Sequence, residues 1–311
     1  MIFSVTGSDA ETLERNCMKK LTLMLLGILL ASLAIAEKID LTNDADPKGD
    51  VDVFNLSGDI EIIGWDRNEI RVTGTLGDDV EEFIFERDGK TTTIKVKVPS
   101  RTRGHKDYSS DLRIRVPKGS SIDVSGVSTD IEVEGVQGEQ ELNSVSGDIE
   151  TQIFAADVDA QTVSGDVDVE GTNKVADANL ESVSGDITAD GLSGEIRANT
   201  VSGDIDITHG DFSSARLETV NGDVNFVAVL RPKGRLDVET INGTVDIMFV
   251  GDVSAKFDIE TFNGRIRNCF GPDAERTSKY APGWELSFTE GDGNGHVTIA
   301  TLNGGVRLCK E

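Results

Sequence analysis

The apolar and polar positions of residues 37–311 follow a recurring phrase of five residues. Each copy is an apolar residue, Ser or Asn, Gly, usually Asp, and then Ile or Val, as in Val183–Ile187. Copies from Val127 onward are 18, 18, 20, 18, 19, 21 and 21 residues apart, and a last copy follows after 40. The phrase glycines include Gly147, Gly165, Gly185, Gly203, Gly222, Gly243, Gly264 and Gly304. Such a fixed period is typical of a stack of similar supersecondary units rather than of one globular core.

Alignment of the copies on this glycine gives four positions of constant character. Apolar residues stand five before, two before and two after the glycine, and we expect all three to face the interior. The position three before the glycine is Ser or Thr, whose hydroxyl can bond to the next unit. These hydroxyl residues are Ser144, Thr162, Ser182, Thr200, Thr219, Thr240, Thr261 and Thr301. The Ser/Asn-Gly pair is a turn signal, so we place a structural corner between two short strands there.

The sequence predicts an all-β fold, an elongated parallel β-solenoid with coils of roughly 20 residues. Successive antiparallel hairpins of a sandwich are the alternative, because Asn-Gly is also a hairpin signal. Parallel coils explain better why the apolar, hydroxyl and glycine positions stay in step, since each position then lies over its own copy. We expect residues 37–117 to form an irregular, strand-rich first part and residues 118–311 to form regular coils with an enlarged last coil.

Residues 1–36 have the pattern of a leader. Lys19 and Lys20 precede an apolar run from Leu21 to Ile35, and Ala34–Ala36 forms a small-x-small cleavage site. The run is shorter than the about 20 residues of a membrane span. We therefore expect a signal peptide over residues 18–36, cleavage after Ala36, and a periplasmic or extracellular chain that is not an integral membrane protein. An uncleaved anchor is the alternative.

The formal net charge of −26 lies in the mature chain, because acidic and basic residues cancel in the leader. A surface this acidic repels nucleic acid and anionic lipid and attracts cations. Aromatic residues make up only 5% of the chain, which leaves little to stack on bases or sugars. Nucleic-acid binding is therefore excluded.

The residue after the phrase glycine forms a candidate acidic surface, here called the aspartate ladder. We expect its carboxylates to line one outer face about 4.8 Å apart. Their repulsion requires solvent screening, hydrogen bonds from turn amides, or a hard cation such as Ca²⁺. No cofactor is firmly indicated, because the calcium-binding nonapeptide pattern is missing. The ladder consists of Asp148, Asp166, Asp186, Asp204 and Asp223.

Cys269 and Cys309 each follow a phrase glycine by five residues, so they occupy equivalent places in the repeat. If two coils separate them, the equivalent positions lie about 9.6 Å apart, whereas one enlarged coil brings them to about 4.8 Å, within disulfide range. Residues 271–295 lack the phrase and contain Pro272 and Pro282, which favours one enlarged coil. We expect a disulfide that closes the end of the stack, since an exported compartment permits one.

The sequence contains no catalytic constellation. His105, His209 and His296 are scattered, and there is no G-x-S-x-G elbow or phosphate loop. Some β-helical polysaccharide lyases and hydrolases use acidic clusters on a coil face, but the basic and aromatic groups that hold their substrates are sparse here. A polysaccharide-binding or polysaccharide-cleaving protein, with calcium as an optional requirement, is therefore the second hypothesis.

Three segments together resemble a known bacterial family. Gly64–Gly74, Asp111–Pro117 and the serial V-S-G-D-I phrase are similar to β-strand-repeat proteins of the domain of unknown function 4097 type, which carry the label "putative adhesin". The resemblance covers nearly all of residues 37–311 and implies an exported β-solenoid without a catalytic residue. The segment Asn268–Gly271 together with Cys309 resembles members from Gram-negative bacteria, which implies the periplasm. We expect a non-enzymatic envelope protein whose acidic face binds an envelope protein or polysaccharide.

Overall fold

The computed structural model describes residues 37–99, 106–278 and 282–311, which contain 23 β-strands and no helix. Accordingly, no helix in this described part is long and apolar enough to span a membrane. The expected leader and its cleavage site lie outside the described residues. The N-terminal strands are β1 (Glu37–Asp44), β2 (Asp50–Trp65), β3 (Glu69–Leu76), β4 (Glu82–Asp88), β5 (Thr91–Lys97) and β6 (Asp111–Pro117).

The remaining strands follow at the intervals that the repeat predicts. The middle strands are β7 (Ser121–Glu134), β8 (Gln140–Asn143), β9 (Ile149–Ile153), β10 (Val158–Gln161), β11 (Val167–Gly171), β12 (Val175–Glu181), β13 (Ile187–Asp190), β14 (Ser193–Ser202), β15 (Ile205–Asn221) and β16 (Val224–Asn242). The C-terminal strands are β17 (Val245–Phe249), β18 (Ala255–Thr261), β19 (Ile266–Asn268), β20 (Glu275–Arg276), β21 (Trp284–Glu290), β22 (Gly295–Asn303) and β23 (Val306–Lys310).

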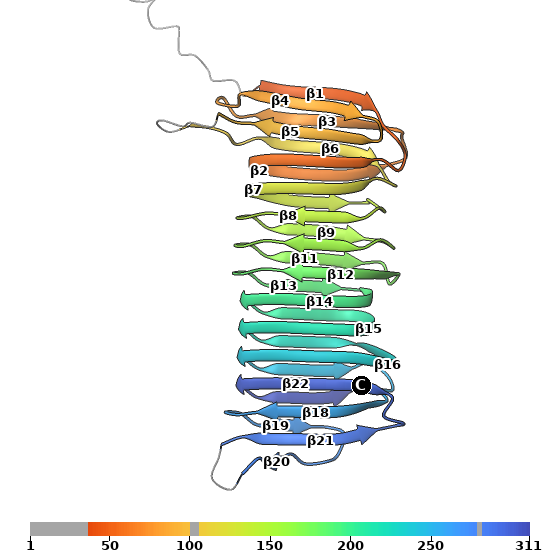
Figure 1. Ribbon diagram of the computed structural model, residues 1–311, viewed down its shortest axis with the longest axis vertical. Coiled ribbons are helices and arrows are strands. Elements are labelled where there is room, and N and C mark those ends of the chain that lie inside the picture. The colour runs from red at the N-terminus through yellow and green to blue at the C-terminus, as the bar shows by residue number, and fades with distance from the viewer. Residues whose placement is uncertain (1–36, 100–105, 279–281) are drawn as a thin grey trace, which may run out of the picture. The chain divides into compact units, whose positions relative to one another are not determined.

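Each middle coil contributes one side to each of two sheet faces (Figure 1). Face 1 contains β8, β10, β12 and β14, and face 2 contains β9, β11 and β13; β7, β15 and β16 bend from one face to the other. The pairing is parallel, and it places Ala160 of β10 beside Leu142 and Leu180 of the adjacent coils. Stacked parallel coils therefore form the fold, and the hairpin alternative is wrong.

The interior between the two faces is filled by apolar side chains that lie over their own copies. Ile187 and Ile205, two residues after a phrase glycine, and Leu180 and Ala198, five residues before one, are each exposed by 1% or less. Because every coil buries this surface only against its neighbours, most of the stability comes from coil-to-coil stacking.

The C-terminal coil is inserted into the stack and does not extend it. β22 pairs with β16 on one side and with β18 on the other, and β23 lies in the same way between β17 and β19. The coil of β18 and β19, earlier in the sequence, thus lies beyond the last coil of the chain (Figure 1). The sequence predicts an enlarged last coil but not its insertion between two earlier coils, because spacing along the chain does not show the order of coils in the stack.

Antiparallel strands cover both ends of the stack. β21 pairs antiparallel with β18 at the C-terminal end. At the other end β2 lies between β7 and the pair β5 and β6, while β4 covers β5, β3 covers β6, and β1 covers β3. These strands cover the parallel edges of the regular coils, which would otherwise be open to pairing with another chain.

A disulfide joins Cys269 and Cys309, as the sequence predicts, with their Cα atoms 4.8 Å apart. Cys269 follows β19 and Cys309 lies in β23, so the bond connects the inserted coil to the coil beyond it. The disulfide therefore holds the C-terminal strands in their position between two earlier coils.

Candidate binding surfaces

The phrase glycines lie where adjacent coils approach most closely. A Cβ on Gly185, Gly203 or Gly222 would lie 1.9, 2.0 or 1.8 Å from the carbonyl oxygen of the preceding corner glycine. Any side chain there would force the coils apart. Of the eight predicted corner glycines only Gly147 has a positive φ, 156°. Close backbone packing, more than turn conformation, therefore explains the repeated glycine.

The buried hydroxyls tie each corner to the next one. Thr200 Oγ1 donates to the carbonyl of Gly185 at 3.0 Å, and Thr261 Oγ1 donates to the carbonyl of Gly304 at 2.8 Å. All eight predicted Ser and Thr residues make this bond to the corner of an adjacent coil. The Ser/Thr position therefore bonds to backbone in the neighbouring coil, as the sequence predicts.

An asparagine ladder lines the corner in the last four coils of the stack, where Asn replaces Ser before the glycine. Asn242 donates to the side-chain oxygen of Asn221, Asn303 to that of Asn242, and Asn263 to that of Asn303, each at 2.8 Å. Stacked Asn side chains add one such bond per coil. Sequence reasoning missed this ladder, although the change from Ser to Asn was its signal.

The aspartate ladder is held by turn amides. The backbone N–H of Asp166 donates to Asp148 Oδ1 at 2.9 Å, and the same bond recurs from Asp186 to Asp166 and from Asp204 to Asp186. The repulsion between neighbouring carboxylates is thus offset by hydrogen bonds from turn amides. The described residues contain no group of three or more His, Cys, Asp or Glu side chains arranged to hold a metal ion. Calcium binding by the ladder, one of the three alternatives that the sequence leaves open, is not tested by this geometry.

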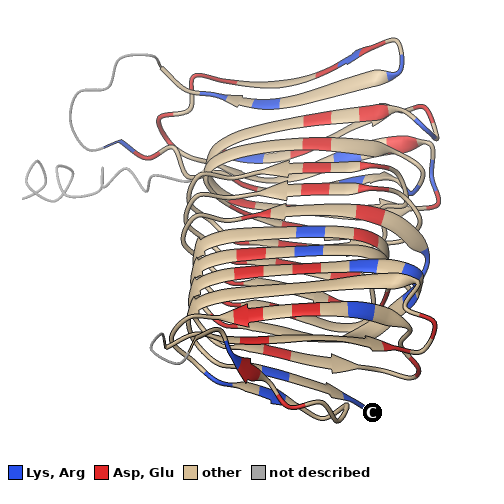
Figure 2. Ribbon diagram, turned by 60° about the horizontal axis from the view of Figure 1, so that its bottom comes forward, with Lys and Arg blue, Asp and Glu red and all other residues tan. Residues whose placement is uncertain are grey.

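A second acidic column runs along the outer surface of face 2. Glu132, Glu150 and Asp168 occupy equivalent register positions in successive coils. Burial raises the pKa of Glu132, and the carboxylates of Glu61, Glu134 and Glu150 raise it further. Figure 2 shows acidic residues recurring from strand to strand. Face 2 therefore carries a largely acidic column that is interrupted at Thr188, and a shallow hollow of about 320 Å³ is lined by its acids Glu132, Glu150 and Asp168.

Arginine residues terminate this column at both ends. Arg113 forms a two-pronged ion pair with Glu61, with contacts of 2.6 and 2.5 Å. Arg307 Nε donates to Asp246 at 2.8 Å, and a second guanidinium nitrogen contacts the same carboxylate. The basic residues near the C-terminus thus include one that pairs with an acid of the adjacent coil.

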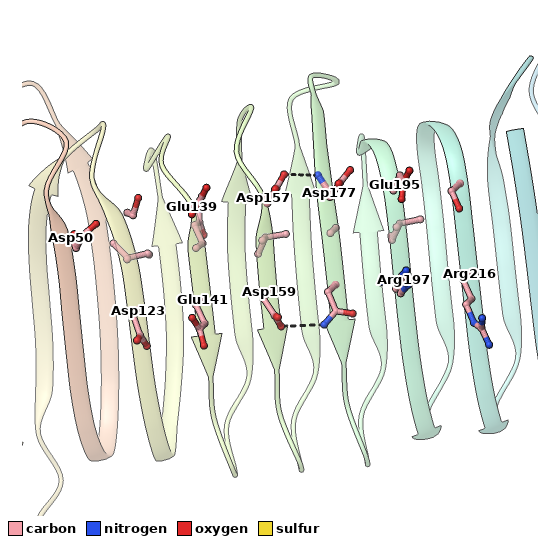
Figure 3. A pocket seen from close by; sticks show the side chains of 18 of the residues that line it. Asp50, Asp123, Glu139, Glu141, Asp157, Asp159, Asp177, Glu195, Arg197 and Arg216 are labelled. Atoms are coloured by element: carbon pink, nitrogen blue, oxygen red, sulfur yellow. Dashed lines mark hydrogen bonds between the residues drawn. The ribbon is translucent and has the colours of Figure 1, made fainter.

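Face 1 carries a shallow groove of about 770 Å³ along its outer surface (Figure 3). At one end burial raises the pKa of Asp52, and the charges of Asp123 and Asp50 add to the effect. Farther along, Arg197 and Arg216 are register partners in adjacent coils. The acidic residues that line the groove are Asp50, Asp52, Asp123, Glu139, Glu141, Asp157, Asp159, Asp177, Glu195 and Asp237.

The apolar residue that opens each phrase faces solvent, so its predicted interior position is wrong. In successive coils Val163, Val183 and Val201 are 46%, 45% and 44% exposed. The chain leaves face 1 at this point, and the buried Ser or Thr just before fixes the next side chain on the outside. We call this column the apolar ladder. In stack order it consists of Val127, Val145, Val163, Val183, Val201, Val220, Ile241, Leu302 and Phe262.

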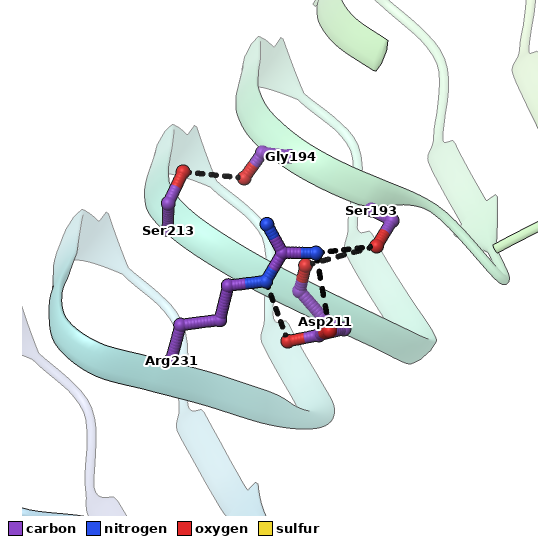
Figure 4. Close-up of polar contacts among 5 residues, drawn as sticks. All are labelled: Ser193, Gly194, Asp211, Ser213 and Arg231. Carbon is purple, nitrogen blue, oxygen red and sulfur yellow. Dashed lines mark hydrogen bonds and ion pairs between the residues drawn. The ribbon is translucent and has the colours of Figure 1, made fainter. Parts of the chain in front are cut away.

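The corner opposite the phrase is held by a network around Arg231 (Figure 4). Its guanidinium donates to both carboxylate oxygens of Asp211, at 3.0 and 3.1 Å, and to Ser193 Oγ at 3.0 Å. Ser213 Oγ adds a bond to the carbonyl of Gly194 at 3.1 Å. These contacts connect β14, β15 and β16, and their geometry is that of a structural clamp.

The two histidines in the described part of the chain, His209 and His296, lie on different strands and belong to no group of metal-binding side chains. His209 Nδ1 lies 2.5 Å from Asp190 Oδ1, and this contact, with one from Thr208, lowers the pKa of Asp190. His296 is on β22, and His105 lies outside the described residues. What the described surfaces offer chemically is therefore repeated contact along the stack.

Fold and surfaces together define a repetitive β-solenoid whose outer side chains form long columns. The chain belongs to the Toastrack DUF4097 family, whose model matches residues 50–308. A comparison with curated proteins finds no match.

Three solved structures illustrate the similarity. A "putative adhesin" from Bacteroides fragilis NCTC 9343 is 13% identical, with 88% of this chain and 97% of that chain covered and a TM-score of 0.43. A "putative lipid binding protein" from Parabacteroides distasonis ATCC 8503 is 12% identical, with coverage of 89% and 97% and a TM-score of 0.40. A "putative adhesin" from the same organism is 11% identical, with coverage of 89% and 98% and a TM-score of 0.37. At these scores the fold assignment rests on strand pairing and on the family match.

Proposed function

We propose that the chain is an exported, non-enzymatic binding scaffold of the adhesin kind that acts in the cell envelope. The observation that supports this most is the side-chain pattern, because the apolar ladder and the aspartate ladder each repeat one kind of side chain from coil to coil. Such columns suit an extended partner that is contacted at many equivalent points. Catalysis instead needs a few unlike groups that converge on one reacting atom.

The test is binding of the fluorescently labelled full-length chain, expressed with its own leader, to isolated envelope fragments. Saturable binding that leaves the fragments chemically unchanged is the expected result. Release of sugar or peptide products, abolished by neutralising the acids of face 1 or face 2, would contradict the proposal.

The groove on face 1 favours a polysaccharide-binding or polysaccharide-cleaving protein as the second candidate. Arg197 and Arg216 lie side by side there, and paired guanidinium groups suit the carboxylates of an acidic sugar. An array of acidic and neutral polysaccharides separates the two candidates. Binding to acidic sugars alone, lost on Arg197→Ala with Arg216→Ala, would favour the second candidate over a protein partner.

A further inference from the structure

Eight of the nine residues of the apolar ladder, all except Val127, form one wall of a groove of about 1090 Å³ that runs along the stack beside the phrase corner. Nine coils contribute one ladder residue each, so at about 4.8 Å per coil the ladder is about 38 Å long. Phe262 and Leu302 are 49% and 48% exposed at its C-terminal end, where Trp284 of β21 also lines the groove. The ladder stays apolar through the inserted coil, although the chain order is broken there.

Folding does not require apolar residues at these positions. The interior is already filled by the positions two after and five before each glycine. The outer side chains that line the groove on face 1 are instead charged or polar, as at Asp159 and Arg197. Scattered exposed apolar residues are ordinary, but a contiguous exposed strip marks an interaction site.

Acidic residues flank the ladder on both sides. Four glutamates line the groove at the position four before the phrase glycine, and three of them, Glu218, Glu239 and Glu260, lie in its C-terminal half. The fourth is Glu181, and the neutral residues Asn143, Gln161, Asn199 and Ala300 hold the same position in the other coils of the groove. On the other side of the corner the aspartate ladder is exposed to solvent. The complementary occupant is therefore apolar along one stripe and positively charged beside it, most strongly at the end near Phe262.

We propose that this groove binds a cationic amphipathic helix of a partner protein. The proposal rests on the proposed role as a binding scaffold and names the class of partner. The apolar stripe of the helix packs on the ladder, and its Lys and Arg side chains pair with the glutamates of the groove. A helix of about 25 residues covers the full length at about 1.5 Å per residue.

Other occupants fit the groove less well. A second copy of the chain would bring the same acidic columns and a net charge of −26. An anionic lipid surface is repelled for the same reason. An extended peptide gains affinity by adding to a sheet edge, but the main-chain groups beside the ladder already bond between coils, as from Ser184 to Val163 at 3.0 Å.

The test is a titration of the full-length chain with a fluorescent peptide of Leu and Lys residues patterned as an amphipathic helix. Val163→Thr, Val183→Thr and Val201→Thr, made together, keep the β-branched shape and remove the apolar surface. We expect this variant to bind about tenfold more weakly or worse. Val175→Thr with Val250→Thr is the control, because both valines are exposed, at 61% and 37%, outside the groove.

A second pair of variants separates specific from general charge attraction. Glu218→Gln, Glu239→Gln and Glu260→Gln remove three charges from the groove, and Glu150→Gln, Asp168→Asn and Asp206→Asn remove three from face 2. We expect only the groove variant to weaken binding, and cooperative urea unfolding serves as the control that both variants are folded.

Several results would overturn the helix proposal. These are equal weakening by both charge variants, no effect of the Val→Thr substitutions, self-association that the Val→Thr variant abolishes, and tighter binding to anionic vesicles than to the peptide. Loss of peptide binding with retained binding to envelope fragments would sink the helix proposal alone and leave the scaffold role standing.

Discussion

At the scale of single residues, the repeat is held by contacts between identical corners. Seven of the eight corner glycines accept a hydroxyl bond from a neighbouring coil. The missing side chain also lets adjacent corners approach each other closely, as in the series Gly185, Gly203 and Gly222. The corner thus combines close packing with a satisfied buried hydroxyl in every coil.

The close approach predicts a large effect of one methyl group. In Gly203→Ala the new Cβ would lie 2.0 Å from the carbonyl oxygen of Gly185, so the coils must separate. Overpacking of this kind costs about 1–3 kcal/mol of unfolding free energy, or more. Urea unfolding measures the cost. Gly305→Ala is the control, because its Cβ would come no closer than 3.3 Å to any neighbour, and an equal loss there would contradict the account.

The hydroxyl bond predicts a smaller effect. Thr200→Val keeps the shape of the side chain and removes the bond to the carbonyl of Gly185, which should cost about 1 kcal/mol. Urea midpoints of the variant and of Thr188→Val, on the outer surface of face 2, provide the comparison. A cost no larger than that of Thr188→Val would show that the hydroxyl bond does not stabilise the corner.

At the scale of strands, the acidic columns place like charges side by side. A raised pKa marks a carboxylate whose ionisation destabilises the folded state, and a lowered pKa marks one whose ionisation stabilises it. The raised pKa of Asp52 means that protonation of this residue favours the folded state, so its contribution is present at low pH and is lost as pH rises through the folded pKa. A hydrogen bond from Arg71 lowers the pKa of Asp40, so the contribution of Asp40 is present at neutral pH and is lost as pH falls through the folded pKa.

These opposite signs give a paired prediction. Asp52→Asn should raise the urea midpoint at pH 7 and leave it unchanged near pH 3, whereas Asp40→Asn should lower it at pH 7 with little effect at the lower pH. Unfolding curves across this range test both at once. Shifts of the same sign at pH 7 would show that net charge, rather than the local partners, controls stability.

The inserted C-terminal coil is the other element with a measurable consequence. Cys309→Ser removes the bond that holds β23 beside β19, and loss of a disulfide that closes a loop of this length costs about 2–5 kcal/mol. Hydrogen exchange should locate the loss in β18, β19, β22 and β23. A uniform loss of protection over all coils would contradict this assignment, as would an unchanged melting temperature.

At the scale of the whole stack, much of the architecture could be predicted because a fixed period fixes how coils lie over each other. The parallel pairing, the disulfide and two buried apolar columns follow from the aligned repeat. The position of the apolar ladder could not be predicted, since the alternation of inward and outward side chains shifts at the corner. Ile241 and Ile247 have equal hydropathy, yet one is 44% exposed and the other is buried.

The order of the coils at the C-terminal end could not be predicted from the sequence either. Phrase spacing gives the distance along the chain, and insertion of β22 between β16 and β18 depends on which open edge the last strand meets. The proposed function depends on the same distinction between buried and exposed columns. An apolar ladder inside the stack would be core, whereas the same ladder outside is the surface on which we propose that a partner binds.

The rate of thiol labelling tests this distinction most directly. Single cysteines are placed at Val183 and Val201 in the ladder and at Ile187 and Ile205 in the interior, all in a Cys17→Ser background with the native disulfide intact. The account predicts rapid modification of the two ladder thiols in the folded protein and modification of the two interior thiols only on unfolding. Modification of the ladder thiols only on unfolding would show that the apolar ladder is buried in the core and cannot form the surface on which the proposed partner binds.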